Sequence, residues 1–440
     1  MIGSGIFIVS AESARLLGSA GWLLAAWVIA GVMTMIASLS CAELAAMLPR
    51  AGGQYVFFRE AYGPLAGFLF GWAMFLVIQT GTIAAVAVAF AKFTGVLVPA
   101  ISGRPLFSIA GWPVSAVQLV ALAVIALLTA TNATGLKAGI RTQNVFTAAK
   151  FAALLALAVA GLMLGNEGAA MRSGELFRAR APDTALAGLP FFLALAAALV
   201  GPLFSQSAWN NVTFAGEEIE DPGRALPRAL LIGCLVVTTL YVLTNVAYLR
   251  CLSLEGIQRA PEDRVGTAAA SALFGPRAAG AMAAAIMVST FGCVNGLVLS
   301  GARVSFAMAR DGLFFRGLEK LNRAGVPANA LWLQAVWAGL LVLSGSYSQL
   351  LKYVISADIL LYVLLVLAVI VLRRRRPEWR RPFRAPAYPL LQILYAAAGA
   401  ALILLLLAGS PRTTWPGYVV LLTGLPVYFL WARKSARRER

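Results

Sequence analysis

The sequence predicts an all-α integral membrane protein with about twelve transmembrane helices. Of its 440 residues, 60% are hydrophobic and only 12% are charged. The apolar runs between the charges reach the roughly 20 residues that a helix needs to cross a bilayer. These runs are too continuously apolar for the alternating strands of a membrane barrel, and a spanning segment must satisfy its own backbone hydrogen bonds. The spanning segments are therefore helices, with the lipid bilayer as their surroundings.

Glycine, proline and charged residues interrupt the apolar runs and set the boundaries of the predicted helices. Each run between two such breaks is taken as one helix that crosses the bilayer. In chain order, the predicted helices cover residues 1–20, 22–48, 64–98, 113–132, 143–164, 188–219, 225–249, 278–309, 328–345, 350–372, 388–408 and 415–432.

Composition also excludes several classes of protein. The chain has no histidine, and its four cysteines are scattered without CxxC spacing, so neither a metal site nor a disulfide framework is predicted. The formal charge of +18 does not indicate a nucleic-acid partner. The same basic excess arises when Lys and Arg gather in the cytoplasmic loops of a membrane protein, and we prefer that explanation.

The distribution of basic residues predicts the orientation in the cell membrane. An even number of crossings puts both termini on one side, and most of the 36 Lys and Arg lie in the loops of that side. The run RRRRPEWRRPFR, residues 373–384, is the strongest marker, and we interpret it as an anchor on anionic headgroups. We therefore expect a multi-pass protein with cytoplasmic N- and C-termini. Because no cleavable signal pattern precedes the first run, insertion is expected to use the helices themselves.

Two predicted helices are interrupted by small or polar residues. The first carries Gly3-Ser4-Gly5, and the sixth carries LFSQSAWNN, residues 203–211. Broken helices at corresponding positions of two halves indicate a transporter built from inverted repeats, with its substrate at the midplane. The alternative for a glycine pair in a membrane helix is close helix packing. The recurrence five helices later favours the transporter.

Longer motifs then resemble a known family. In order along the chain these motifs are GSGIF, AELAAMLPRAGGQYVFFREAYGPLAGFLFGW, FTAAKFAAL, FSQSAWNNVTFAGEEIEDPGRALPRAL, STFGCVNG, LRRRRPEWRRPFRAPAYP and GLPVYF. Together they resemble the amino acid-polyamine-organocation superfamily, and most closely its L-type amino-acid transporter family. The resemblance implies a five-plus-five inverted repeat with broken helices 1 and 6, plus two C-terminal helices.

The same resemblance divides the chain and sets its mechanism. Residues 1–165 would form the first repeat, residues 188–373 the second, and residues 374–440 the basic loop, helices 11 and 12 and a cytoplasmic tail. The family carries amino acids by alternating access. The resemblance also implies an inner half-helix before the GSG motif, so we expect that the start codon of this chain is assigned too late or that the chain is truncated.

The resemblance also implies the residues that hold an amino acid. The unwound backbone at Ile2, Gly3, Ser4 and Gly5 would bind the carboxylate at the positive end of a half-helix and contribute a carbonyl to the ammonium. The carbonyls of Phe204, Ser205 and Ser207 would accept from the ammonium, with the Phe204 ring as a lid. Ser207, Ala208 and Asn210 would border the side-chain pocket. Relatives that take dibasic substrates can carry an acid at the position of Ser207. This chain has none there, which favours neutral substrates.

Lys150 is predicted to replace a coupling ion. It lies about 10 Å inside the fifth predicted helix, at 1.5 Å per residue, which is deep for an ammonium that reaches the interface by snorkelling. The resemblance places it where sodium-coupled relatives hold sodium, bridging helices one and eight near Ser289 and Cys293. A fixed cation there would make transport independent of sodium. Because burial disfavours the charged form of a lysine, Lys150 is also a candidate carrier of a coupling proton.

We therefore expect a sodium-independent carrier of neutral amino acids that works by exchange or with protons. Alternatives are a cationic amino-acid or polyamine permease, a channel, and a sensor that binds amino acids without transporting them. An enzyme is not expected, because the membrane runs lack histidine and a carboxylate pair, and no cofactor is predicted. Glu217 and Glu218 either close an inner gate with basic loops or form a solvated loop. The need for an accessory subunit stays open.

Overall fold

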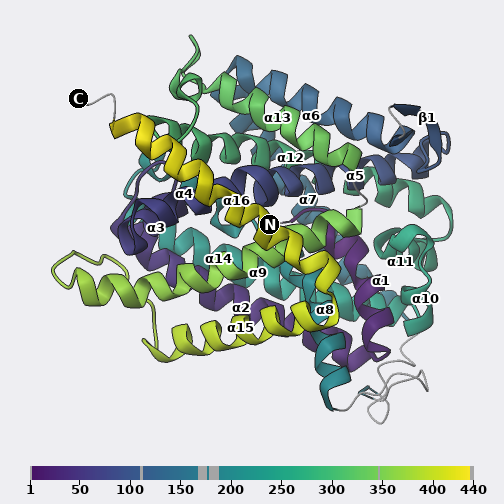
Figure 1. Ribbon diagram of the computed structural model, residues 1–440. Helices are drawn as coiled ribbons and strands as arrows, with labels where there is room; N and C mark the ends of the chain where they lie inside the picture. Colours follow the sequence, from purple (N-terminus) through teal and green to yellow (C-terminus); the bar gives the residue numbers. More distant parts are fainter. Residues whose placement is uncertain (1, 110–111, 167–175, 178–187, 345–346, 437–440) are drawn as a thin grey trace.

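The computed structural model describes residues 2–109, 112–166, 176–177, 188–344 and 347–436. It is a bundle of long helices that run roughly side by side (Figure 1). The long helices are α1 (Gly5–Leu17), α2 (Ala20–Met47), α4 (Pro64–Ala73), α5 (Gln79–Leu97), α6 (Ala116–Thr134), α7 (Leu136–Leu164), α8 (Gly188–Gln206), α9 (Pro222–Cys251), α12 (Arg277–Arg310), α13 (Ala328–Ser344), α14 (Tyr347–Arg375), α15 (Leu390–Gly409) and α16 (Pro411–Ala436).

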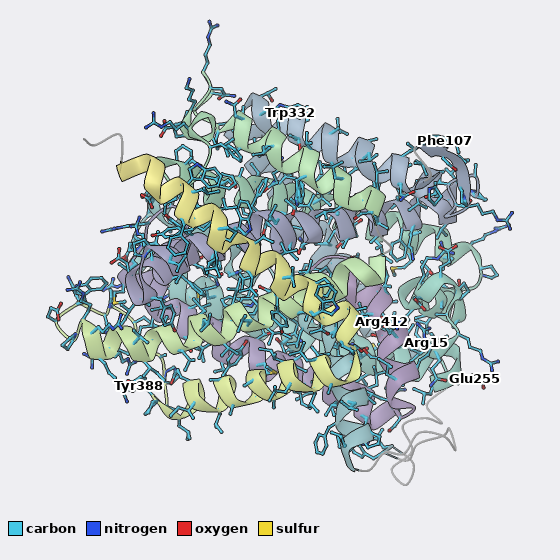
Figure 2. The ribbon with its side chains drawn as sticks, viewed as in Figure 1. Arg15, Phe107, Glu255, Trp332, Tyr388 and Arg412 are labelled. Carbon is cyan, nitrogen blue, oxygen red and sulfur yellow. The ribbon has the colours of Figure 1, made fainter. Side chains whose placement is uncertain are left out.

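Shorter elements close the two ends of the bundle. The antiparallel hairpin of β1 (Pro105–Ile109) and β2 (Trp112–Ser115), together with α10 (Leu254–Gln258) and α11 (Val265–Phe274), lies at one end. There Phe107 and Glu255 are exposed, and Arg15 pairs with Asp263 (Figure 2). The opposite end holds α3 (Gln54–Tyr62) and the loop with Tyr388.

The predicted helices are found in the structure with small shifts at their ends. Helices α4 and α5 are joined by a π-helical turn (Met74–Ile78) and form the single span predicted over 64–98. Nine helical spans in the described part of the chain are long and apolar enough to cross a membrane. Helices α1 and α13 are shorter, so the count of twelve crossings stays a prediction. The sequence did not indicate α3, α10, α11 or the hairpin, because these segments are short.

Three predicted helices have wrong boundaries. The fifth, predicted from residue 143, begins seven residues earlier, at Leu136. The other two lie at the interruptions. The first helix, predicted from residue 1, begins at Gly5 and ends at Leu17. The sixth, predicted through residue 219, ends at Gln206 and is followed by a 3-10 turn, Trp209–Phe214. Ala208 between them has a φ of 62°, in the left-handed region that a continuing helix cannot use. Ser4, Ser207 and Asn210 therefore lie outside regular α-helix, whereas Ser205 and Gln206 end α8.

Small residues bring the helices of the core close together. A β-carbon on Gly201 of α8 would lie 2.7 Å from Val9 Cβ on α1. A β-carbon on Gly292 of α12 would lie 2.5 Å from Phe146 Cβ on α7. Such contacts are the usual way in which membrane helices associate, because lipid provides no hydrophobic drive between them. They fix α1 against α8 and α7 against α12, the two pairs that carry the predicted site.

Candidate functional site

The two helix interruptions lie against each other inside the bundle. A β-carbon built on Gly5 would lie 2.7 Å from Ser205 Cβ and 2.9 Å from Ser205 Cα. Only glycine at position 5 allows this approach without displacing α1 from α8. Ile2, Ser4, Ser205 and Ser207 are all buried. The structure therefore brings together the two predicted halves of the amino-acid site.

The ends of these helices have opposite polarity. Helix α1 begins at Gly5, and the side chain of Ser4 before it does not cap the first amide groups. Helix α8 ends at Gln206 beside it, so its last carbonyls lie next to the first amides of α1. A helix start carries a partial positive charge and a helix end a partial negative charge. This arrangement suits a zwitterion, with its carboxylate at α1 and its ammonium at α8.

The predicted carbonyl acceptors of α8 already have intramolecular partners. The Phe204 carbonyl accepts from the Ser207 amide at 3.0 Å and from Ser207 Oγ at 2.7 Å. The Ser205 carbonyl accepts from the Tyr241 hydroxyl at 3.3 Å. A ligand ammonium at these oxygens would share or replace these bonds. Binding would therefore change the local conformation of the interruption.

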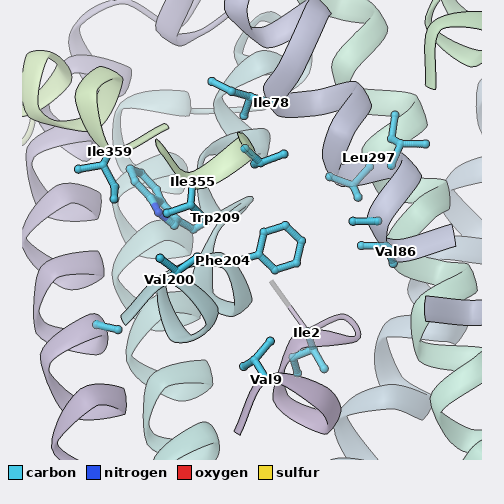
Figure 3. Packing of buried hydrophobic residues seen from close by; sticks show 14 of the residues in the cluster. Ile2, Val9, Ile78, Val86, Val200, Phe204, Trp209, Leu297, Ile355 and Ile359 are labelled. Carbon is cyan, nitrogen blue, oxygen red and sulfur yellow. The ribbon is translucent and has the colours of Figure 1, made fainter. Parts of the chain in front are cut away.

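Phe204 and Asn210 have different surroundings. The Phe204 ring is buried and lies between Ile2 and the Trp209 region (Figure 3). Asn210 Nδ2 instead donates to Gln54 Oε1 of α3 at 2.8 Å, and Asn210 is buried. Phe204 is thus placed where a ligand between α1 and α8 would contact it, whereas the Asn210 amide ties the 3-10 turn to α3.

A small cavity of about 20 Å³ lies beside the interruption of α8. Ser207 and Trp209 line it from one side, and Asp358 and Tyr362 of α14 line it from the other. Sequence reasoning missed Asp358, although an acid alone in an apolar run is a signal of function. The structure thus brings a carboxyl to the Ser207 side of the site that the sequence had left without one.

Lys150 lies on the face of α7 that packs on α12. Its side chain is 6% exposed and lies close enough to Cys293 to interact electrostatically. Ser289, one turn before Cys293, has a buried hydroxyl without a hydrogen-bond partner in the described part of the chain. The structure thus brings Lys150 and Cys293 together. The link to α1 and the role as a substitute for sodium stay predictions.

The predicted gate acids pair with basic residues of α12. Glu218 binds Arg303 through two bonds of 3.0 and 2.9 Å, and Glu217 lies 3.8 Å from Arg310. Nearby, Asp311 pairs with Arg59 of α3 and accepts from the Tyr55 hydroxyl at 2.6 Å.

Tyr55 retains its proton in this cluster. Burial and the contact with Asp311 raise the pKa of Tyr55, so its hydroxyl remains a hydrogen-bond donor. The acids after the 3-10 turn therefore belong to an ion-pair cluster that joins three segments at this end of the bundle, although the side chains of Glu217 and Glu218 are 47% and 49% exposed.

The basic run at residues 373–384 is partly built into the protein. Glu43 of α2, 1% exposed, binds Arg373 with bonds of 2.8 and 2.6 Å and accepts from the Ala385 amide at 2.7 Å. Arg381 lies 3.5 Å from the same carboxylate. These two arginines hold the loop against α2, so the headgroup role can apply only to exposed members such as Arg374. Sequence reasoning missed Glu43, another lone acid in an apolar run.

Replacing Glu43 with glutamine is expected to destabilise the protein. The substitution leaves Arg373 and Arg381 without their counter-charge, and breaking a buried ion pair costs about 3–5 kcal/mol. Thermal unfolding of the purified protein in detergent should show a clear fall in the midpoint. Arg374→Gln, an exposed change in the same run, is the matched control, with an expected effect below about 0.5 kcal/mol. Equal midpoints for Glu43→Gln and the control would contradict the conclusion that Glu43 and the two arginines hold the loop against α2.

Comparison with known proteins identifies the family. The model of the amino acid permease family matches residues 1–426. The large neutral amino acids transporter small subunit 2 of Mus musculus is 32% identical over 99% of this chain and 79% of its own length. The Asc-type amino acid transporter 1 of Mus musculus is 31% identical, over 98% of this chain and 78% of its own. The serine/threonine exchanger SteT of Bacillus subtilis (strain 168) is 29% identical over 99% of this chain and 94% of its own.

These matches extend over the helix interruptions, the buried lysine and the basic loop described above. They agree with the resemblance seen in the motifs and exclude the enzyme, because the matched proteins are transporters and permeases. This chain, a multi-pass membrane protein, belongs to the amino acid permease family of the amino acid-polyamine-organocation superfamily.

Proposed function

We propose that this protein is a secondary transporter that carries neutral amino acids across the cell membrane by alternating access without sodium. The observation that carries the proposal is the contact between the start of α1 and the end of α8. Two half-helix ends of opposite polarity, buried in a membrane protein, offset the desolvation of a carboxylate and an ammonium together. The names of the relatives, which specify neutral amino acids or serine and threonine, support the substrate class.

The same proposal assigns roles to the rest of the chain. Residues 1–165 and 188–373 act as the two inverted repeats, and the termini lie in the cytoplasm. The cluster of Glu217, Glu218, Arg303 and Arg310 then lies on the cytoplasmic side and holds the inner end closed. Because these ion pairs are partly exposed, each is weak and can break during the transport cycle.

Counterflow is the experiment that tests this function. The purified protein is reconstituted into vesicles loaded with unlabelled alanine, and labelled alanine is added outside without sodium. A carrier accumulates label transiently because internal substrate returns the binding site to the outside. A channel, an enzyme or a sensor would not produce this overshoot, and its absence would refute the proposed function.

Competition in the same vesicles tests the substrate class. Unlabelled alanine, serine and larger neutral amino acids should reduce counterflow strongly, whereas lysine and arginine should leave it nearly unchanged. The reason is that neither helix interruption carries an acid that could pair with a cationic side chain. The matched comparison is methionine against lysine, whose unbranched side chains have similar lengths but differ in charge. Strong inhibition by arginine would favour the cationic or polyamine alternative.

A further inference from the structure

Asp358 is a carboxyl deep within a membrane-spanning helix. It lies in α14 (Tyr347–Arg375), about 25 Å along the axis from Arg375 at 1.5 Å per residue. Its exposed fraction is 4%. Charged groups at such depth are rare and belong to ion pathways or proton relays unless a structural partner neutralises them.

The surroundings of Asp358 supply a hydrogen bond but no counter-charge. Its side chain has a hydrogen-bonding contact with Tyr362, one turn further along α14. The other titratable groups that face this pair are Tyr395 of α15 and Cys41 of α2. No basic side chain forms an ion pair with Asp358 in the part of the chain that the structure describes. A carboxylate in this setting must be stabilised by a proton, by a bound cation or by water beside it.

Asp358 is also connected to the interruption of α8. Both line the cavity of about 20 Å³, which has room for about one water molecule. The Trp209 ring, from the 3-10 turn after the interruption, stacks on Tyr362 with centroids 5.4 Å apart and planes at 27°. The Trp209 side chain lies beside Ile355 and Ile359 of α14 (Figure 3). Trp209 and Tyr362 therefore form a continuous line of contact from the interruption to the carboxyl.

We propose that Asp358 carries the proton that is coupled to transport. In the closed arrangement that holds an amino acid, its carboxyl holds one proton, taken from water on the side where the site last opened. When the site opens to the other side, that O–H bond breaks and the proton passes to the water there, leaving a hydrated carboxylate. The empty site returns without the proton, with a water molecule beside the carboxylate in the cavity, so that one proton crosses with each amino acid. The inference rests on the proposed function, because it requires a cycle that opens the site alternately to each side.

Proton-driven uptake in vesicles tests the proposal. Labelled alanine uptake without sodium is measured with the exterior about one pH unit more acidic than the interior, and again at equal pH. One coupled proton permits up to about tenfold more accumulation under that gradient. In the wild type, uptake with the gradient should be several times the uptake at equal pH. A pH-sensitive dye should report that the lumen becomes more acidic when alanine is added. Asp358→Asn should give a ratio near one and no acidification. The matched control Glu255→Gln, an exposed acid on α10, should keep the wild-type ratio.

Further outcomes separate this inference from the proposed function. Missing counterflow in the wild type would refute the transport function itself, whereas counterflow with a ratio of one would refute only the role of Asp358. If Asp358→Asn keeps the wild-type uptake ratio but changes which amino acids compete, the proton role of Asp358 is also overturned. If Asp358→Asn is inactive, Tyr362→Phe, which keeps the carboxyl but removes its hydrogen bond, should keep the ratio and shift the pH midpoint of uptake. An unchanged midpoint would count against the proposal.

Discussion

Lys150→Ala should nearly abolish amino-acid turnover while leaving the protein folded. The ammonium occupies a buried site between α7 and α12, where Cys293 lies close and the Ser289 hydroxyl has no described partner. Removing it leaves an unfilled polar space, and an unsatisfied buried polar group costs about 1–3 kcal/mol, or about 5- to 150-fold in the equilibrium between arrangements. If the lysine replaces sodium, wild-type transport should be the same in sodium, potassium and choline.

Alanine counterflow in each of the three salts measures both expectations. Lys92→Ala is the matched control, because Lys92 also lies within a spanning helix but is only half-buried. It should retain most of the wild-type rate, and both variants should elute as single peaks in size-exclusion chromatography. A sodium requirement in the wild type, or equal rates for the two variants, would contradict the role of Lys150.

Measurements with and without internal amino acid, at equal and unequal pH, then separate two mechanisms. An exchanger requires amino acid on the opposite side, whereas a proton-coupled carrier accumulates substrate under an inward proton gradient. Because Asp358 is the proposed proton site, Lys150→Ala that keeps residual uptake should keep its response to the gradient. If this variant loses its response to the gradient, Lys150 and not Asp358 carries the coupled proton.

The sequence predicted the spanning segments well because their determinant is local. Each helix is an apolar run of sufficient length, and such a run has no alternative in lipid. The interruptions were also visible, since Gly3-Ser4-Gly5 and FSQSAWNN break the pattern of their own segments. The predicted end of the sixth helix was wrong because the backbone turns left-handed at Ala208 and the helix cannot continue past Gln206. No helix propensity reveals this conformation.

Pairings between distant segments could not be predicted from the sequence. The partner of Glu43 is Arg373, and Asp358 meets Trp209 only through Tyr362 and the cavity that they share. Both acids stand alone in apolar runs, which indicates a special role without naming a partner. The absence of an acid at position 207 is visible in the sequence, whereas the carboxyl that α14 places on that side is visible only in the structure.

Gly5→Val should abolish amino-acid binding, and two contacts at this position contribute. The α1 start that would bind the carboxylate has no room for a β-branched side chain. In addition, any β-carbon at position 5 would overlap Ser205 and push α1 away from the end of α8. Either effect separates the two helix ends that the proposed site needs together. Calorimetric titration with alanine should show no binding to this variant.

A graded series tells the two effects apart. Gly5→Ala meets the same Ser205 atoms, at 2.7 Å for Cβ and 2.9 Å for Cα, but adds only a methyl group on the ligand side. Adding Ser205→Gly to Gly5→Ala removes the nearer of these two contacts. If the glycine serves helix contact alone, the double variant should recover much of the wild-type affinity. If the ligand also contacts this backbone, affinity should stay low although thermal stability recovers. Gly233→Val on α9, where a β-carbon meets nothing within 4 Å, is the control and should bind alanine normally. Normal alanine affinity in Gly5→Val itself would overturn the assignment of the α1 start as the carboxylate site.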